Sequence, residues 1–546
     1  MSNVRSEPWY MNAIFYEVYV RAFCDSDGDG HGDLRGLLQK LDYLRDLGVD
    51  CLWLMPIYPS PLKDDGYDIA DFLSVLPTYG KLEDFKALIQ AVHDRGMRII
   101  LDLVLNHTSD QHPWFQAARS DPNSPYHDFY VWSETDDKYS EARIIFLDTQ
   151  DSNWSWDEQA KKYFWHRFYP SQPDLNFDNP RVQDEMISVM KFWLDLGIDG
   201  FRADAVPYLF EREGTNCENL PETHVYLKRL RRFIDENYPG KILLCEANQW
   251  PEDVRPYFGD GDEFQMGFHF PLMPRVYMSI RKGDRTPLEW VLGRTPPIPE
   301  HCQWCTFLRN HDELTLEMVT EEERQWMWRE YAPEPRMRLN LGIRRRLAPL
   351  LDNDRGRIEL AYALLFSLPG TPIVYYGDEI GMGDDIWMED RNGVRTPMQW
   401  EDAPNAGFSN APQEALYLPA IDGELYGYHR VNVADQRYNP DSLWSLVRRM
   451  IAVRKANPVF GLGNLSWVDM GTPAVAAYWR QMEGSALLII NNLSGSAQPV
   501  DTGRLAKPLA AGFDVLLGRN TPGLRAGQLP MVLAPHEYLW LKIRGG

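Results

Sequence analysis

The sequence lacks a long apolar segment that could cross a membrane. Its longest apolar run extends from Leu360 to Tyr376 but is interrupted by Pro369, Gly370 and Pro372. This run therefore predicts a buried helix, a turn and a buried strand, not a membrane span. The first eight residues also lack the apolar core of a signal peptide. We therefore expect a cytoplasmic protein with no membrane partner.

Cysteine and positive charge are also scarce. The six cysteines are scattered, and Cys302 and Cys305 form one Cys-x-x-Cys pair without a second pair, which argues against a zinc site. The formal net charge is −23, from 79 acidic and 56 basic residues. This charge argues against nucleic acid as a partner and is compatible with cation sites.

The remaining composition is that of a large globular protein. The 546 residues exceed the usual size of one domain, and 44% of them are hydrophobic. The 19 Trp and 27 Tyr suit flat, hydroxylated ligands such as sugars. Because the same residues also fill large cores, this indication is weak.

Strands and helices are predicted to alternate along most of the chain. Segments rich in apolar and β-branched residues predict eight strands, and the segments between many of them have helical periodicity. The predicted strands are 13–20, 50–55, 98–104, 198–204, 241–246, 264–269, 304–308 and 372–376. This alternation predicts right-handed βαβ units and an α/β fold of the (β/α)₈ TIM barrel type.

Two insertions and a C-terminal β domain complete the predicted organisation. Residues 106–172, rich in Trp, Asp, Pro and Ser, predict a subdomain inserted after the third strand, and residues 313–357 predict a charged, helix-prone insertion. The barrel then comprises residues 1–105 and 173–457. Residues 458–546 predict an antiparallel β-sandwich domain, because short alternating strands are separated by Gly and Pro turns. Its predicted strands are 474–479, 486–491, 531–533 and 537–542.

Acidic residues after the first predicted strand have the spacing of a cation-binding loop. They stand at positions 1, 3, 5 and 9 of the loop with Gly at position 6, as in an EF-hand, but position 12 is Gly36 instead of the closing Glu. A solvated acidic turn is the alternative, although so many carboxylates would repel one another without a cation. We predict a Ca²⁺ site, with Mg²⁺ as the alternative ion. Its predicted ligands are the side chains of Asp25, Asp27, Asp29 and Asp33 and the carbonyl of His31.

Polar residues stand at the C-terminal ends of four predicted barrel strands. They are Asn106 and His107 after the third strand, Arg202 and Asp204 at the end of the fourth, Glu246 at the end of the fifth, and His311 and Asp312 after the seventh. In a TIM barrel these strand ends meet at one rim, so we expect the side chains to converge there.

Three converging carboxylates suit the chemistry of a glycosidic bond. Asp204, kept ionised by Arg202, is the predicted nucleophile, whereas an ordinary Arg–Asp ion pair is the alternative. Glu246 is the predicted general acid, because partial burial raises a carboxyl pKa. Asp312 is predicted to stabilise positive charge on the sugar, which completes a retaining double displacement. The predicted donors to sugar hydroxyls are His107 and His311, for which a structural role in the core is the alternative.

The strand-end motifs resemble the signature segments of the α-amylase family of glycoside hydrolases and transglycosylases. They are Asp102-Leu-Val-Leu-Asn106-His107, Gly200-Phe-Arg202-Ala-Asp204, Leu243-Leu-Cys-Glu246 and Leu308-Arg-Asn310-His311-Asp312. The resemblance covers nearly the whole chain. Two further segments resemble the branch that contains oligo-1,6-glucosidases and α-glucosidases: Gln172-Pro-Asp174-Leu-Asn176 and Arg395-Thr-Pro-Met-Gln-Trp400.

The resemblance implies further site residues. It implies that Tyr67 stacks under the non-reducing glucose and that Asp64 pairs with Arg395 to close the far end of the pocket. Gln172 and Asn248 are also expected to bind substrate. The resemblance implies a second structural calcium and no organic cofactor. The implied ligands of this calcium are the side chains of Asn106, Asp174 and Glu211 and the carbonyls of Tyr208 and Leu209.

Three segments resemble those members of the branch that isomerise maltose to trehalose: 204–214, 246–253 and 264–273. The resemblance implies a disaccharide substrate, minor hydrolysis to glucose and a homo-oligomer, either a dimer or a tetramer. We expect the two insertions and Asn248-Gln249-Trp250 to close over the site and retain glucose. A hydrolytic α-glucosidase or oligo-1,6-glucosidase and a sucrose isomerase are alternatives on the same scaffold. A non-catalytic relative of amino-acid transporter heavy chains is disfavoured, because all three carboxylates are present.

Overall fold

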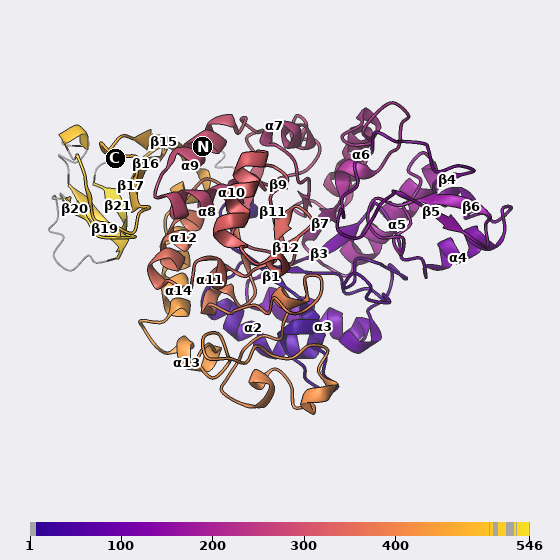
Figure 1. The fold of residues 1–546 in the computed structure, drawn as a ribbon, viewed down its shortest axis with the longest axis horizontal. Helices are drawn as coiled ribbons and strands as arrows, with labels where there is room; N and C mark the ends of the chain where they lie inside the picture. Colours follow the sequence, from indigo (N-terminus) through magenta and orange to yellow (C-terminus); the bar gives the residue numbers. More distant parts are fainter. Residues whose placement is uncertain (1–6, 502, 506–511, 520–528, 531, 545–546) are drawn as a thin grey trace.

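The protein has three parts arranged along its longest axis. The computed structural model describes residues 7–501, 503–505, 512–519, 529–530 and 532–544. In Figure 1 the barrel lies in the middle, the C-terminal sheet at one end, and the strands β4, β5 and β6 of the first insertion at the other. No helix among the described residues is both long and apolar enough to cross a membrane.

Eight parallel strands form a closed barrel, which confirms the predicted fold class. Their order around the barrel is β1-β14-β10-β9-β8-β7-β3-β2, with each end of the series paired to close the ring. The strands are β1 Phe15–Val18, β2 Cys51–Leu54, β3 Arg98–Val104, β7 Gly200–Asp204, β8 Ile242–Cys245, β9 Met266–Phe268, β10 Gln303–Phe307 and β14 Thr371–Tyr375. Their bounds agree with the predicted ones to within two residues.

Helices surround the barrel, and most of them bury one apolar face against it, whereas α8 and α12 are buried on nearly all sides. The longer ones are α2 Leu34–Leu47, α3 Leu82–Asp94, α5 Pro180–Asp195, α6 Pro221–Asn237, α8 Leu272–Lys282, α9 Thr286–Arg294, α12 Arg355–Ser367 and α14 Leu443–Lys455. The short helices α1 Val20–Phe23, α7 Pro251–Val254, α13 Val433–Arg437 and α15 Val459–Leu462 lie between them. The first full turn of α2 is capped by Asp33, whose side chain accepts from the N–H of Gly36.

Gly200 lets strand β7, which carries the predicted nucleophile, pack closely beside β8. Its φ is +149°, and a Cβ at this position would lie 2.2 Å from the carbonyl oxygen of Ile242. A larger residue would therefore push the two strands apart, together with the side chains that they carry.

Both insertions contain small antiparallel sheets. The first includes α4 Pro113–Ser120 and the sheet of β4 Trp132–Ser133, β5 Trp154–Asp157 and β6 Lys162–Trp165. The second includes the sheet of β11 Leu314–Thr315, β12 Arg338–Leu339 and β13 Gly342–Ile343, with α10 Glu321–Tyr331 and α11 Leu347–Leu350. The helical character of the second insertion was predicted, whereas its sheet was not.

The C-terminal part is an antiparallel β domain, as the sequence predicts. A five-stranded sheet has the order β15-β16-β17-β21-β19, and a two-stranded sheet pairs β18 with β20. Leu533 of the small sheet packs into the same apolar core as Val475 and Leu488 of the large one. The strands are β15 Asn464–Val468, β16 Val475–Met482, β17 Ser485–Asn492, β18 Gln498–Pro499, β19 Phe513–Gly518, β20 Val532–Leu533 and β21 Tyr538–Ile543. Met531, at the start of one predicted strand, lies outside the described residues.

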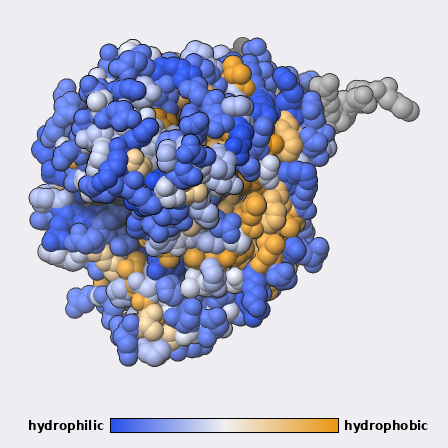
Figure 2. Space-filling view, turned by 90° about the vertical axis from the view of Figure 1, so that its right-hand side faces the viewer, coloured by the Kyte–Doolittle hydropathy of each residue, from blue (hydrophilic) through white to orange (hydrophobic). Residues whose placement is uncertain are grey.

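The molecular surface is largely polar. Figure 2 views the end of the molecule that carries β4, β5 and β6, and shows a mainly hydrophilic face with a broad hydrophobic band on its right and smaller hydrophobic patches elsewhere. This distribution agrees with the acidic composition.

Candidate active site

The guanidinium of Arg202 is the centre of the site. Its Nη1 contacts Asp102 and lies 2.6 Å from Oδ1 of Asp204, and its Nη2 lies 2.5 Å from Oε1 of Glu246. Asp102 is paired with Arg202 in the register between β3 and β7. The structure thus brings the predicted nucleophile and the predicted general acid to one buried cation.

Local backbone geometry directs these side chains to the rim. Arg202 and Asp204 are two residues apart on β7, so they share one face of the strand. Ala205, which follows, has a left-handed φ of +53°. Its N–H donates to Oε2 of Glu246 at 3.2 Å. A strained backbone at this position is typical of a functional site, and here it holds the carboxyl of Glu246 from a second side.

Asp102, Asp204 and Glu246 share the single guanidinium of Arg202. Burial raises the pKa of these carboxyls, whereas the positive charge of Arg202 lowers it. Burial raises the pKa of Glu246 to about 7, and the charges of Asp204 and Asp312 add to the rise while Arg202 opposes it. Burial also raises the pKa of Asp204, although Arg202 lowers it. Arg202 therefore acts on Asp204 in the predicted direction, but burial outweighs it. The arrangement favours a proton on Glu246, as a general acid requires.

Asp312 is held in its ionised form. Burial would raise its pKa, but His311 and Arg391 overcome this effect and leave the pKa well below its usual value. His311 contacts Asp312 through Nε2 at 3.1 Å and Glu17 through Nδ1 at 2.5 Å. Burial lowers the pKa of His311, but the two carboxylates outweigh it and raise the pKa to about 9. A protonated His311 therefore supports an anionic Asp312.

Tyr67 and His107 form one wall of the site. The ring of Tyr67 stacks on His311 with centroids 5.2 Å apart and an interplanar angle of 13°. His107 contacts the carbonyl of Tyr67 through Nε2 at 3.2 Å and lies 3.3 Å from the amide nitrogen of Gln172. Burial lowers the pKa of His107 to about 3, so this ring is neutral. Gln172 also donates to Oδ2 of Asp64 at 2.9 Å.

The predicted pairing of Asp64 with Arg395 is wrong. Asp64 pairs with Arg391, whose Nη2 lies 2.5 Å from Oδ1, whereas Arg395 pairs with Asp65 at the same distance. The two neighbouring aspartates diverge because Asp65 has a left-handed φ of +46°. Both arginines also contact Oδ1 of Asp312, at 2.7 Å for Arg391 and 3.1 Å for Arg395. Of the two, Arg391 lines the cavity.

The sequence prediction missed several site residues. Asp102 and Glu17 each interrupt an apolar strand, β3 and β1, and both are fully buried. A charged side chain inside an apolar strand is the signal that could have identified them. Arg391 and Asp65 lie in irregular segments, where no periodicity indicates the direction of a side chain.

A cavity opens above the carboxylates. It contains about 860 Å³ of space, including the part open to solvent, and is lined by Asp204, Glu246 and Asp312 together with aromatic rings. Further aromatic and acidic residues of its lining are Phe146, Phe168, Tyr208, Phe270, Glu313 and Glu317. This combination of apolar faces and polar groups suits a small sugar.

Glu317 joins three segments over this cavity. Its Oε2 accepts from Nη1 of Arg143 at 2.8 Å and from Nδ2 of Asn248 at 3.1 Å. Arg143 belongs to the first insertion, Glu317 to the second, and Asn248 to the segment after β8. Asn248 also donates to Oγ1 of Thr315 at 3.0 Å. The segments expected to close over the site are thus bonded to one another.

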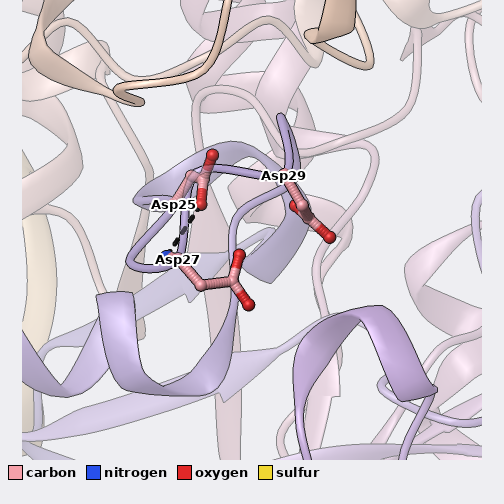
Figure 3. Close-up of side chains that lie close together, drawn as sticks. All are labelled: Asp25, Asp27 and Asp29. Atoms are coloured by element: carbon pink, nitrogen blue, oxygen red, sulfur yellow. Dashed lines mark hydrogen bonds between the residues drawn. The ribbon is translucent and has the colours of Figure 1, made fainter.

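The acidic loop after α1 brings three carboxylates together. Ligand atoms of Asp25, Asp27 and Asp29 all lie within 4.8 Å of one another, and Figure 3 shows them on one loop with the N–H of Asp27 donating to Asp25. This donor set is the kind that Ca²⁺ or Mg²⁺ takes. The oxygens of Asp33 accept from Ser26 and from Gly36, so this side chain caps α2, and its place among the ligands stays a prediction.

The second expected calcium site contains buried oxygen atoms without partners. Oδ1 of Asn106, Oδ2 of Asp174 and Oε1 of Glu211 are buried and have no hydrogen-bond partner within the described part of the chain. Burial raises the pKa of Asp174 to about 8, and burial together with Asp174 raises that of Glu211. Buried oxygens that lack donors fit a hard cation. Tyr208 and Leu209, the predicted carbonyl ligands, lie in and after the short turn Val206–Tyr208 that follows β7.

Comparison with known proteins identifies relatives over nearly the whole chain. Residues 17–463 match the family described as alpha amylase, catalytic domain. The trehalose synthase/amylase TreS of Mycobacterium tuberculosis is 56% identical over 544 residues, which are 98% of this chain and 90% of that protein. The oligo-1,6-glucosidase of Bacillus cereus is 30% identical, with 89% of this chain and 91% of that protein covered.

The fold is also similar to a crystal structure of the trehalulose synthase MutB from Pseudomonas mesoacidophila MX-45. The TM-score is 0.80 with 27% sequence identity, and the match covers 98% of this chain and 100% of that chain. The barrel, the insertions and the C-terminal domain thus lie within the compared region.

Proposed function

Since this chain belongs to the alpha-amylase family, we propose that it isomerises maltose to trehalose by a retaining intramolecular glucosyl transfer. The 56% identity with a trehalose synthase/amylase over 98% of the chain supports this substrate and product. The carboxylates at Arg202 support the retaining double displacement.

The first displacement uses the two carboxyls on Arg202. One glucose of maltose occupies the inner pocket between Tyr67 and Asp64, and Glu246 donates its proton to the glycosidic oxygen. A carboxylate oxygen of Asp204 attacks the anomeric carbon, so the bond from that carbon to the leaving glucose breaks as the bond to Asp204 forms. Anionic Asp312 stabilises the positive charge that develops on the ring.

The second displacement reverses these roles. The freed glucose stays in the cavity and presents its anomeric hydroxyl to the glucosyl-enzyme. Glu246, now ionised, takes the proton of that hydroxyl. The hydroxyl oxygen of the freed glucose then displaces Asp204 from the anomeric carbon of the glucosyl-enzyme. Two inversions retain the α configuration and give the α,α-1,1 bond. Water in place of the glucose hydroxyl gives the minor hydrolysis to glucose.

The bonds of Glu317 are the observation that carries the isomerase assignment. Retaining a free glucose between two displacements requires the cavity to stay closed on the solvent side. Glu317 supplies this closure by holding Arg143 and Asn248 from two other segments. We therefore assign the outer part of the cavity, beside Glu317 and Asn248, to the glucose that turns over.

Two alternatives use the same carboxylates. A hydrolytic α-glucosidase is supported by the 30% identity with an oligo-1,6-glucosidase, and a sucrose isomerase by the similarity to MutB. The higher identity with trehalose synthases favours maltose and trehalose over both.

We also propose two structural Ca²⁺ ions and no organic cofactor. The carboxylates of Asp25, Asp27 and Asp29 support the ion in the acidic loop, for which Mg²⁺ is the alternative, and the unpartnered oxygens of Asn106, Asp174 and Glu211 support the second ion. Both ions would hold loops that follow barrel strands and take no part in the displacements.

Chromatography of the products from maltose tests the proposed function. The purified protein is incubated with maltose alone, and we expect mainly trehalose with little glucose. Asp204→Asn, which keeps the shape of the side chain, is the inactive control, with turnover lower by about four orders of magnitude. Mainly glucose would instead identify a hydrolase. In a separate incubation with sucrose, trehalulose or isomaltulose as the product, without trehalose from maltose, would identify a sucrose isomerase.

A further inference from the structure

Two arginines and two tryptophans form a stack beside the closing segments. The guanidinium carbon of Arg275 lies 4.4 Å from the ring centroid of Trp290 and 5.4 Å from that of Trp250. Arg294 lies 4.7 Å from Trp290 and 5.5 Å from Trp250. The two indole rings meet edge to face at 5.9 Å. Cation–π contacts of this kind are strongest when the cation is desolvated, as Arg275 is.

Arg275 also bonds to the second insertion, whereas Arg294 bonds to Glu252. Its Nη1 donates to the carbonyls of Pro271 at 3.0 Å and Met318 at 2.9 Å, and its Nη2 donates to Oε2 of Glu323 at 3.2 Å. The side chain is fully buried, and its Nε has no hydrogen-bond partner within the described part of the chain. A buried cation with these partners cannot move without leaving donors unsatisfied.

The two segments that Arg275 holds are the ones that meet over the cavity. Trp250 is two residues beyond Asn248, and Met318 is the residue after Glu317. Asn248 and Glu317 are bonded to each other at 3.1 Å. The planar guanidinium therefore contacts both segments within two residues of the bond that joins them at the cavity.

We propose that Arg275 is a positioning residue for the isomerisation. Through Trp250 and Met318 it sets the distance between the segments that carry Asn248 and Glu317, and so determines whether the freed glucose is retained or replaced by water. This inference rests on the proposed function. According to this inference, Arg275 helps to determine the product although it touches neither the substrate nor the catalytic carboxyls.

Arg275→Lys tests this inference, with Arg294→Lys as the matched control. Lysine keeps the charge but lacks the planar face and the fork of donors that Arg275 uses. Arg294 stacks on the same rings, but its polar contact is with Glu252, and its side chain is 46% exposed. Products from maltose are quantified for the wild type and both variants, after circular dichroism shows that each is folded.

We expect Arg275→Lys to raise the ratio of glucose to trehalose by about threefold or more, because small shifts at a positioned site change reaction outcome strongly. Arg294→Lys should keep the wild-type ratio. An unchanged ratio for Arg275→Lys, or equal shifts for both variants, would overturn the inference.

If Arg275→Lys does not fold, Trp250→Leu removes the same contact from the other side and must raise the ratio of glucose to trehalose. An unchanged ratio again overturns the inference. Absence of trehalose from the wild type would contradict the proposed function itself, which separates the two failures.

Discussion

At the scale of the residue, the decisive feature is that Arg202 cannot neutralise all the carboxyls around it. Asp102, Asp204 and Glu246 present three acidic groups to one cation in a buried site. A proton on one of them relieves the repulsion, and Glu246, with its pKa raised to about 7, is the group that takes it. Asp312 is separately held ionised by His311 and Arg391. The site therefore contains protonated Glu246 as the acid, beside Asp204 and Asp312, which act as anions.

The pH dependence of the reaction follows from this distribution. Glu246 must be protonated for the first displacement, and its pKa of about 7 means that the active form is lost as the pH rises through this value. We expect kcat/KM for maltose to fall about tenfold per pH unit above pH 7. Glu246→Gln should remove this alkaline limb and lower the rate by about 10² to 10⁴-fold. A profile that stays flat to pH 9 would contradict the assignment of Glu246 as the acid.

Individual site residues could be predicted from the sequence to different degrees. Asp204 and Glu246 were predicted because strand ends of a barrel meet at one rim, and the structure brings them together at Arg202. The partner of Asp64 was predicted wrongly, because pairing depends on which way two adjacent aspartates turn, and the left-handed φ of Asp65 is set by tertiary contacts. Local sequence does not specify such a choice.

At the scale of the element, the segments after β3, β8 and β10 act as one closing unit. Glu317 holds this unit together through Arg143 and Asn248. The eight barrel strands were predicted well because most of their residues are apolar or β-branched and because helical segments separate many of them. The strands of the insertions were not, because β4 and β11 are only two residues long and are defined by their partners.

Opening the closing unit should change the ratio of products but leave both displacements at the catalytic carboxyls intact. Glu317→Gln weakens both charge-assisted bonds, so we expect the ratio of glucose to trehalose to rise about threefold or more while total maltose consumption falls little. Glu322→Gln, an exposed change on α10 of the same insertion, is the matched control and should behave as the wild type. A ratio that does not differ between the two variants would contradict the closure by Glu317.

The turn after β7 should depend on Ca²⁺. Asn106, Asp174 and Glu211 present buried oxygens without donors, so an ion there stabilises the folded state by about 2.7 kcal/mol at 100 times its Kd. We expect Ca²⁺ to raise the thermal midpoint of protein treated with a chelator. Glu211→Gln should reduce this response, and Glu213→Gln, an exposed neighbour, should retain it. Equal responses in both variants would place the stabilising ion elsewhere.

At the scale of the whole molecule, the chain combines a large acidic surface with a hydrophobic band. The net charge of −23 favours solubility, whereas the hydrophobic band in Figure 2 offers apolar area for self-association. We expect a dimer or a tetramer, and light scattering after size-exclusion chromatography measures the mass. A mass of 63.4 kDa, that of one chain, at micromolar concentration would contradict this expectation.

The overall fold could be predicted from the sequence because the pattern that indicates a strand recurs many times along the chain. Eight strand-like segments predict the barrel even when single boundaries are wrong, and short strands between turns predict the C-terminal β domain. How the insertions meet over the cavity was not accessible in detail, because bonds such as Arg143 to Glu317 join residues 174 positions apart.

The most direct test of the account is conversion of unlabelled maltose in the presence of excess ¹³C-labelled glucose, followed by mass spectrometry of the products. If the enzyme isomerises maltose and retains the freed glucose, trehalose forms as the main product and remains unlabelled. Glucose as the main product would contradict isomerisation, and trehalose that carries the label in one ring would contradict retention in the closed cavity.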